Sequence, residues 1–330
     1  MLSFLLNFTI AQTTTPTPAP VEVVQPQQVR PLPGKLDDVP VFNSNSPELV
    51  LKEGILLSTF PKKGKEVSDS HLNFPFKGRF DIFAHHVAKA SPPDDLRTLY
   101  LGIILHNPTS QPVTVNVLNA ASYLSQPDAP FIDLPSQKNN YFGTVFSGPG
   151  SRVMSDILRK RRQPTIPDQL IIPPGESRMM MNAPIPVKEL EPPINGRSTL
   201  MRLWSSSKVY AASLAMFAPT NTDGKERAPT LQEWQKILDN GELAGPRDKA
   251  PTPPEDIDKP IIYGRVSGVA KGSQWNSLVT DNPKKTYLTI PQSGKAFSYG
   301  IATLHRGTLG TNQIQSAKML ARYPDTAYYA

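Results

Sequence analysis

Proline is the residue that most restricts the folds open to this chain. The sequence holds 36 prolines in 330 residues, whereas average usage would give roughly 16. Proline fixes the backbone angle φ and has no N–H group to donate, so it interrupts helices and central strands. The prolines are therefore expected in loops, at strand ends and in linkers. A chain with this many loops is typically built from short β-strands.

The apolar residues behind the first 34 positions come in short runs bounded by Pro, Gly, Asn and Ser. Residues 99–106 (LYLGIILH) are followed by an Asn-Pro turn, and residues 113–118 (VTVNVL) then alternate apolar and polar side chains. This alternation is typical of a half-buried strand, so the two runs predict a hairpin. Residues 199–204 and 209–217 predict a second strand pair, with a helix as the alternative for 209–217.

One helix is marked by its first turn. Thr230 and Glu233 have the spacing of a capping box, in which the side chain of each residue bonds the backbone of the other. Apolar side chains follow at three- and four-residue spacing, at Leu231, Trp234 and Leu238. The predicted fold class is therefore mainly β, with β-sandwich-like antiparallel sheets and one or two short helices.

The chain begins with a short apolar segment. Residues 1–11 (MLSFLLNFTIA) fit a secretory signal peptide and are too short to span a bilayer, which needs about 20 residues. No Lys or Arg precedes the apolar run, which leaves open an incomplete signal peptide, and a buried strand is the alternative. Residues 12–34 are rich in Thr and Pro and predict an extended linker. Together the two segments predict export.

The rest of the chain, residues 35–330, is predicted to form one β-rich domain. A stretch rich in Pro and charged residues, 245–260, follows the predicted helix. It indicates either a domain boundary near residues 220–260 or a long surface loop.

Composition limits the chemistry. Cysteine is absent, which excludes disulfides, thiolate metal sites and a cysteine nucleophile. The 35 Lys and Arg against 28 Asp and Glu give a formal charge of +7. This excess indicates an anionic partner such as acidic polysaccharide or lipid headgroups, and a mildly basic surface without a partner is the alternative.

The strongest candidate site is a basic run in which Asp156 is the only carboxylate. Its members are Arg152, Arg159, Lys160, Arg161 and Arg162. If the run begins in a helix, the helix dipole favours the cations at the helix end. We expect these residues to bind an acidic glycan or a phosphorylated lipid headgroup, with a solvated charged loop as the alternative. Nucleic acid is not expected, because no aromatic residue is interleaved with the charges.

Histidines and carboxylates give no clear catalytic or metal site, and no cofactor is expected. The nearest approach to a metal site is Asp81, His85 and His86. In a helix Asp81 and His85 would share a face, whereas in a strand His85 and His86 would point to opposite sides. Ordinary packing is favoured over metal binding. Candidate carboxylates for glycoside hydrolysis are Asp94, Asp95 and residues 255–258. Residues 146–151 (FSGPGS) lack the Gly-x-Ser-x-Gly motif of serine esterases and predict a plain loop.

Three segments resemble a known family. They are residues 71–89 (HLNFPFKGRFDIFAHHVAK), 99–124 (LYLGIILHNPTSQPVTVNVLNAASYL) and 196–218 (GRSTLMRLWSSSKVYAASLAMFA). The chain resembles a cyanobacterial family of uncharacterised exported proteins, domain of unknown function 3370, over nearly everything behind the linker. The resemblance implies export and a further C-terminal part, since members of the family are longer. It supplies no catalytic residues.

The sequence as a whole predicts an exported protein of the periplasm, cell surface or extracellular space, without a transmembrane span. Its expected role is to bind or scaffold an anionic component of the cell envelope, and an enzymatic activity is not favoured. Two alternatives are a hydrolase that acts on polysaccharide and a purely structural surface protein.

Overall fold

A computed structural model describes most of the chain behind the predicted linker. The described residues are 34–135, 138–249, 252, 253, 256, 258–260, 262, 265, 267–278, 280, 282 and 284–286. They belong to one compact unit that begins at Leu32. The predicted signal peptide and residues 12–33 of the predicted linker lie outside the described residues.

The described residues form a mainly β structure with two α-helices, as predicted. The strands are β1 (Pro40–Ser44), β2 (Leu49–Val50), β3 (Gly54–Ser58), β4 (Phe76–Lys89), β5 (Leu99–His106), β6 (Val113–Leu124), β7 (Gln169–Ile172), β8 (Ser177–Ile185), β9 (Ile194–Phe217) and β10 (Ser267–Lys271). The helices are α1 (Gly148–Leu158), α2 (Leu231–Asn240) and the short 3₁₀-helix η1 (Ser68–Ser70).

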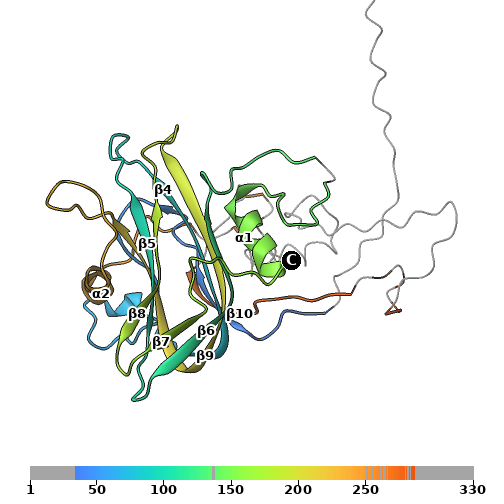
Figure 1. Ribbon diagram of the computed structural model, residues 1–330, viewed down its shortest axis with the longest axis horizontal. Coiled ribbons are helices and arrows are strands. Elements are labelled where there is room, and N and C mark those ends of the chain that lie inside the picture. The colour runs from blue at the N-terminus through green and yellow to red at the C-terminus, as the bar shows by residue number, and fades with distance from the viewer. Residues whose placement is uncertain are drawn as a thin grey trace, which may run out of the picture. The chain divides into compact units, whose positions relative to one another are not determined.

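The longest strand, β9, belongs to two sheets. Its first part, residues 194–209, pairs with β4 and β6. Its second part, residues 210–217, pairs with β5, and β3 pairs with the same part. The first sheet has the order β10-β1-β4-β9-β6-β7, and the second has the order β3-β9-β5-β8. Figure 1 shows the two sheets face to face, with α2 on one outer side and α1 on the other.

All described strand pairs are antiparallel, as predicted, except those that β1 and β2 make with β4. Between β2 and β4 the chain passes through β3, which lies in the second sheet. A strand that returns to its sheet after such a crossover can run parallel to its neighbour, whereas a tight hairpin cannot produce this pairing. The first sheet is therefore mixed at this edge.

The predicted hairpin of β5 and β6 is wrong in its pairing. Both segments are strands, but β5 lies in the second sheet and β6 in the first. The Asn-Pro turn carries the chain from one sheet to the other. Buried Asn107 holds this turn, because its side-chain amide donates to the carbonyl oxygens of Gln111 (2.7 Å) and Ile172 (2.9 Å).

The second predicted strand pair is wrong as well, because residues 199–204 and 209–217 belong to the single strand β9. The helix alternative for 209–217 fails for the same reason. Between its pairs with Ser205 and Val209 of β9, β4 advances by only two residues, from Gly78 to Phe76. Residues 205–208 (SSSK), between the two predicted strands, therefore form a bulge rather than a turn. A bulge bends its strand, which lets β9 continue from one sheet into the other.

The main hydrophobic core lies between the two sheets. It includes Phe80 and Ile82 of β4, Leu101 and Ile103 of β5, and Met201 and Leu203 of β9, all fully buried or nearly so. Side chains of both sheets meet in this one cluster, which is the defining feature of a sandwich.

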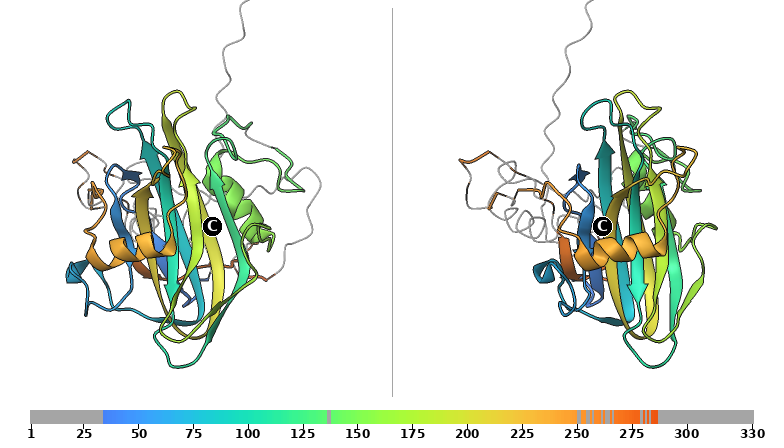
Figure 2. Two further views of the ribbon diagram at one scale, coloured as in Figure 1. Left: turned by 60° about the vertical axis from the view of Figure 1, so that its left-hand side comes forward. Right: turned by 90° about the vertical axis from the view of Figure 1, so that its left-hand side faces the viewer.

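α2 covers the outer face of the second sheet, lying across its strands (Figure 2). Trp234 of α2 is fully buried with Ile104 and Leu214 of the sheet. A Cβ added to Gly102 of β5 would lie 2.7 Å from the Trp234 ring, so only glycine leaves room for it. The indole nitrogen of Trp234 donates to Oδ1 of Asn182 (3.3 Å), which satisfies its one donor.

The capping box predicted for α2 is confirmed. The Thr230 hydroxyl accepts from the backbone N–H of Glu233 (3.3 Å), and the Glu233 carboxylate accepts from the backbone N–H of Thr230 (2.7 Å). Arg227 also donates to both oxygens of Glu233, at 2.6 and 2.8 Å. The start of α2 is thus fixed by local contacts that the sequence contains.

α1 covers the outer face of the first sheet (Figure 1). Val153 and Ile157 of α1 are buried there, together with Ala121 and Tyr123 of β6 and Leu200 of β9. The prediction of a plain loop over residues 146–151 is wrong in part, since α1 begins at Gly148 and accepts Pro149 in its first turn. Neither α1 nor α2 is long and apolar enough to cross a membrane.

Candidate functional site

A pocket of about 510 Å³ lies beside α1. The charged and aromatic part of its wall consists of Tyr123, Phe146, Arg152, Asp156, Arg161 and Arg162. Three of the five residues predicted to bind an anion therefore share one pocket. Arg159 and Lys160 lie outside its wall.

Arg152 is held against two aromatic rings. Its guanidinium carbon lies 4.0 Å from the centroid of the Tyr123 ring and 5.0 Å from that of Phe146. Nη1 of Arg152 also donates to the carbonyl oxygen of Asp128. Stacking on aromatic faces fixes the plane of a guanidinium without neutralising its charge.

A backbone reversal brings Arg161 and Arg162 to the pocket. α1 ends at Leu158 with Arg159 as its C-cap, and Lys160 has a φ of +56°, in the left-handed region. The chain then returns to β6, where the N–H of Gln163 donates to the carbonyl oxygen of Ala120 (2.9 Å). This reversal separates Arg161 and Arg162 from Arg159, although the residues are neighbours in the sequence.

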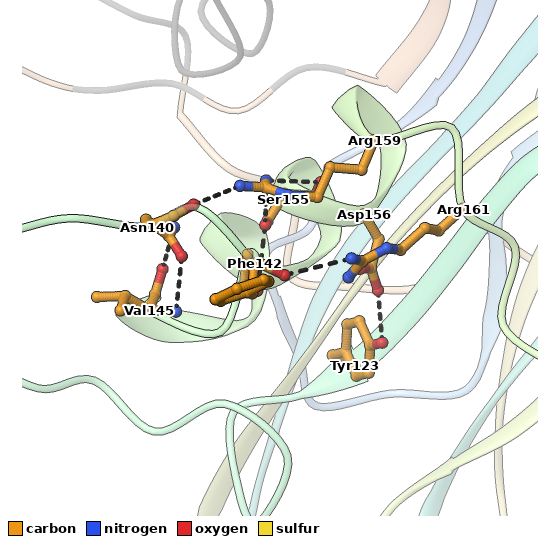
Figure 3. Close-up of polar contacts among 9 residues, drawn as sticks. Tyr123, Asn140, Phe142, Val145, Ser155, Asp156, Arg159 and Arg161 are labelled. Atoms are coloured by element: carbon orange, nitrogen blue, oxygen red, sulfur yellow. Dashed lines mark hydrogen bonds and ion pairs between the residues drawn. The ribbon is translucent and has the colours of Figure 1, made fainter.

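Arginines also hold the loop before α1 against the helix (Figure 3). Arg159 donates from Nη2 to the carbonyl oxygen of Asn140 (2.6 Å) and from Nη1 to Oγ of Ser155 (2.8 Å). Arg161 donates from Nη2 to the carbonyl oxygen of Phe142 (3.2 Å). Two of the predicted anion-binding residues therefore have a structural role in this loop.

Asp156 is the only carboxylate among the described residues of the pocket wall. Its Oδ2 accepts from the Tyr123 hydroxyl (2.6 Å), and its Oδ1 lies 3.5 Å from Nη1 of Arg161. Burial, and then the bond to Asp156, raises the pKa of Tyr123, so its hydroxyl stays protonated as a donor. Three guanidinium groups against one carboxylate leave an excess of two positive charges. Such a wall attracts an anion and can bond its oxygens.

The aromatic side of the pocket was missed by sequence reasoning. Tyr123 comes from β6 and Phe146 from the loop before α1, so neither lies within the basic run. Residues 120–124 (AASYL) do carry a signal, because the alternation of the strand stops there and both faces are buried. Arg152 covers the Tyr123 ring, so that ring is not free to stack with a nucleic-acid base.

The residues considered for a metal site point apart. The segment is the strand β4, in which Asp81 and His85 share one face and His86 lies on the other. Asp81 bonds Arg79 and Ser273, and His86 bonds Oγ of Ser44 (2.9 Å) and the carbonyl oxygen of Pro47 (2.8 Å). Within the part of the chain that the structure describes, no three His, Asp or Glu side chains gather where they could share a metal ion.

His85 joins a hydrogen-bonded chain that resembles a catalytic triad. Its Nδ1 lies 2.8 Å from Oγ of Ser198, and its Nε2 lies 3.2 Å from Oε1 of Glu48. Ser198 is only 2% exposed, however, and Glu48 also accepts from Arg265 (2.9 Å). The bond from His85 lowers the pKa of Glu48 to about 2. These hydrogen bonds link β4 and β9 to Glu48, the residue before β2. Ser198 is buried and is not placed to act on a substrate in solvent.

Two of the carboxylates considered for glycoside hydrolysis, Asp95 and Asp256, pair with nearby cations. Asp95 bonds Arg97 (2.7 Å), two residues along the chain. Asp256 bonds Lys259 (3.0 Å), and residues 255 and 257 lie outside the described residues. These ion pairs give Asp95 and Asp256 a local structural role, and the hydrolase alternative stays a prediction.

The fold and the site define a class: a β-sandwich whose sheets share one strand, with a helix on each outer face and an arginine-lined pocket beside one helix. The chain matches the family model described as "Protein of unknown function (DUF3370)" over residues 27–330, and it belongs to this family. The predicted family is thereby confirmed, whereas a cyanobacterial origin stays a prediction. No curated protein and no solved structure matches the chain.

Proposed function

We propose that this protein binds an anionic component of the cell envelope in the pocket beside α1. The observation that carries the proposal is the charge of the pocket wall, in which Arg152, Arg161 and Arg162 face one carboxylate, Asp156. Among the described residues, only Arg161 of these three arginines has a carboxylate partner. A bound anion would supply the missing counter-charge.

The arginines keep donors for such a ligand. The hydrogen bonds of Arg152 and Arg162 to carbonyl oxygens each use Nη1. A guanidinium has five N–H donors, so Nη2 and Nε can still bond a carboxylate, sulfate or phosphate group. Arg161 and Arg162 are exposed, which makes the pocket reachable from solvent.

Export is part of the proposal. The apolar segment of residues 1–11, the Thr- and Pro-rich residues 12–34 and the absence of cysteine all suit a protein of the periplasm, the cell surface or the extracellular space. The partner would then be an acidic polysaccharide or the headgroups of an anionic membrane.

The test compares two variants with equal loss of charge. One carries Arg161→Ser and Arg162→Ser, and the control carries Lys208→Ser and Lys236→Ser, which are exposed lysines away from the pocket. Binding to dextran sulfate is measured against salt concentration. We expect the arginine variant to lose about tenfold or more in affinity, since hydrogen bonds to charged groups contribute about 1.5–3 kcal/mol each.

The control should retain wild-type affinity, and binding should weaken as salt rises. Equal losses in both variants would show a diffuse charge effect and contradict a role for the pocket. The hydrolase alternative predicts release of soluble fragments from cell-wall or capsular glycans, and the purely structural alternative predicts neither binding nor turnover.

A further inference from the structure

Among the described residues, the four most exposed large apolar side chains belong to residues close in the sequence to those that line the pocket. They are Phe131 (75% exposed), Tyr141 (80%), Phe142 (76%) and Leu158 (63%), and we refer to them as the apolar rim. The first three belong to the loop before α1, and Leu158 is the last residue of α1. Tyr141 and Phe142 directly precede Gly143, which lines the pocket, so exposed apolar side chains adjoin its charged wall. Exposed apolar surface bordered by polar residues marks a surface that binds a partner.

The backbone that carries the apolar rim is fixed in place. The carbonyl oxygen of Phe142 accepts from Arg161 (3.2 Å), and the Asn140 side chain bonds the backbone of Val145 in both directions (2.8 and 3.0 Å; Figure 3). Gly143 has a φ of +71°, and a Cβ there would lie 2.7 Å from side-chain atoms at the end of α1. The loop cannot turn its aromatic rings inward without breaking these contacts.

Phe131 is fixed in a similar way at the other end of the loop. Its ring lies over the start of α1, where a Cβ on Gly148 would be 2.3 Å from the ring. The N–H of Ile132 donates to Oγ of Ser147 (3.0 Å), and this hydroxyl donates to the carbonyl oxygen of Ile132 (2.7 Å). The apolar rim is therefore built before any partner binds.

We propose that the apolar rim inserts into the surface of an anionic lipid bilayer while Arg152, Arg161 and Arg162 bind the lipid headgroups. This inference rests on the proposed function and names the partner of the same site. Aromatic side chains favour the interface between headgroups and acyl chains, and each nearby arginine adds attraction to an anionic leaflet. The contacts of Arg161 with both the loop and Asp156 place charge and apolar rim together.

The composition of the apolar rim favours lipid over polysaccharide. A sugar can stack on the face of an exposed ring, but it gives Leu158 nothing to pack against. Acyl chains accept Leu158 and Phe131 as readily as Tyr141 and Phe142, because burial of apolar area is not directional. The charge beside the apolar rim favours an anionic bilayer over a neutral one.

The test uses the full chain and two kinds of vesicle, one of phosphatidylglycerol with phosphatidylcholine and one of phosphatidylcholine alone. The rim variant carries Tyr141→Ser and Phe142→Ser. The matched control carries Leu72→Ser and Leu243→Ser, two exposed leucines that lie beside β3 in the second sheet. Co-sedimentation with the vesicles and affinity for dextran sulfate are measured for each protein.

We expect wild type and control to bind the anionic vesicles, and the rim variant to bind them about tenfold or more weakly with unchanged affinity for dextran sulfate. If the rim variant binds the vesicles as wild type does, or wild type binds dextran sulfate but no vesicles, the bilayer inference is wrong and the proposed function stands. If wild type binds neither, the proposed function fails as well. Unchanged thermal unfolding of the rim variant confirms that it is folded.

Discussion

The two outer faces of the sandwich are each covered by one helix, but the two helices are attached by different means. α2 places the fully buried Trp234 against Gly102, and its own residues cap its first turn. α1 buries the smaller Val153 and Ile157, and arginine side chains that bond backbone carbonyl oxygens hold the loop before it. Beside α1 the surface keeps a pocket and exposed aromatic rings.

We infer that this difference separates stability from the proposed binding. An apolar contact as close as that of Trp234 excludes water and leaves no room for a ligand. Arginines that bond carbonyl oxygens keep their charge, so they can support a loop and still attract an anion. The α2 face is therefore expected to contribute more to stability, and the α1 face more to recognition.

The largest expected effect is at the α2 face. Trp234→Ala should lower the free energy of unfolding by about 3–5 kcal/mol, because it removes a fully buried aromatic side chain and leaves a cavity. Urea unfolding measures this loss. Lys236→Ala, exposed on the same helix, should change it by less than about 0.5 kcal/mol. If Trp234→Ala lowers the free energy of unfolding no more than Lys236→Ala does, the α2 face does not have the larger contribution to stability that we expect.

Acid should destabilise the protein through two buried histidines, one beside each sheet: His86 bonds Ser44 of β1, and His71 bonds Ser58 of β3. Burial lowers the pKa of His86 to about 3 and that of His71 to about 4, whereas an unfolded histidine titrates near 6.5. Below pH 6.5 the histidines of the unfolded chain therefore bind protons, whereas those of the folded chain stay neutral. The stability from these histidines is complete above about pH 6.5 and is lost as the pH falls toward the folded pKa values.

The expected size of the acid effect follows from the pKa of His86. Each pKa unit of difference corresponds to about 1.4 kcal/mol. His86 alone should therefore lower the free energy of unfolding by on the order of 3 kcal/mol by about pH 4. The free energy of unfolding, measured at several pH values, checks this slope. NMR titration of the His86 ring provides a second readout, and a midpoint near 6.5 would contradict the prediction.

The smallest expected effect is at the α1 face. Arg159→Gln should lower the free energy of unfolding by about 1–2 kcal/mol, since it removes the charged donor to Asn140 and Ser155. The freed loop should be cut faster by chymotrypsin beside Tyr141 and Phe142. Lys160→Gln removes the same charge from an exposed neighbour and should leave the cleavage rate unchanged. Faster cleavage in both variants would contradict a specific role for Arg159.

Local features of the fold were predictable because local chemistry fixes them. The capping box of Thr230 and Glu233 and the apolar spacing behind it predict α2, and the structure contains both bonds of the box. The high proline content and the alternation of residues 113–118 predict strands, and the structure is mainly β. The predicted turn after residue 106 is also confirmed.

Strand partners were not predictable in the same way. The Asn-Pro turn fits a hairpin and a crossover between sheets equally well, and the bond of Asn107 to the distant Ile172 forms only in the folded chain. Residues 205–208 (SSSK) have the composition of a turn, yet β9 continues through them as a bulge. In both cases contacts between residues far apart in the sequence overrode the local pattern.

The basic run shows the same division within the candidate site. The sequence places five cations close together and predicts a single role for all of them. The left-handed turn at Lys160 separates Arg161 and Arg162 from Arg159, and only folding brings Tyr123 of β6 under Arg152. A pocket depends on the direction of side chains, which neighbours in space decide.

By itself, the sequence determined the β-rich composition of this protein, the first turn of α2 and the location of its positive charge, because these depend on residues within a few positions of one another. The tertiary structure decided that one strand serves two sheets and that one helix is held by a tryptophan and the other partly by arginines. Those outcomes depend on which surfaces meet when the sandwich closes, and burial of apolar area between distant segments drives that closure.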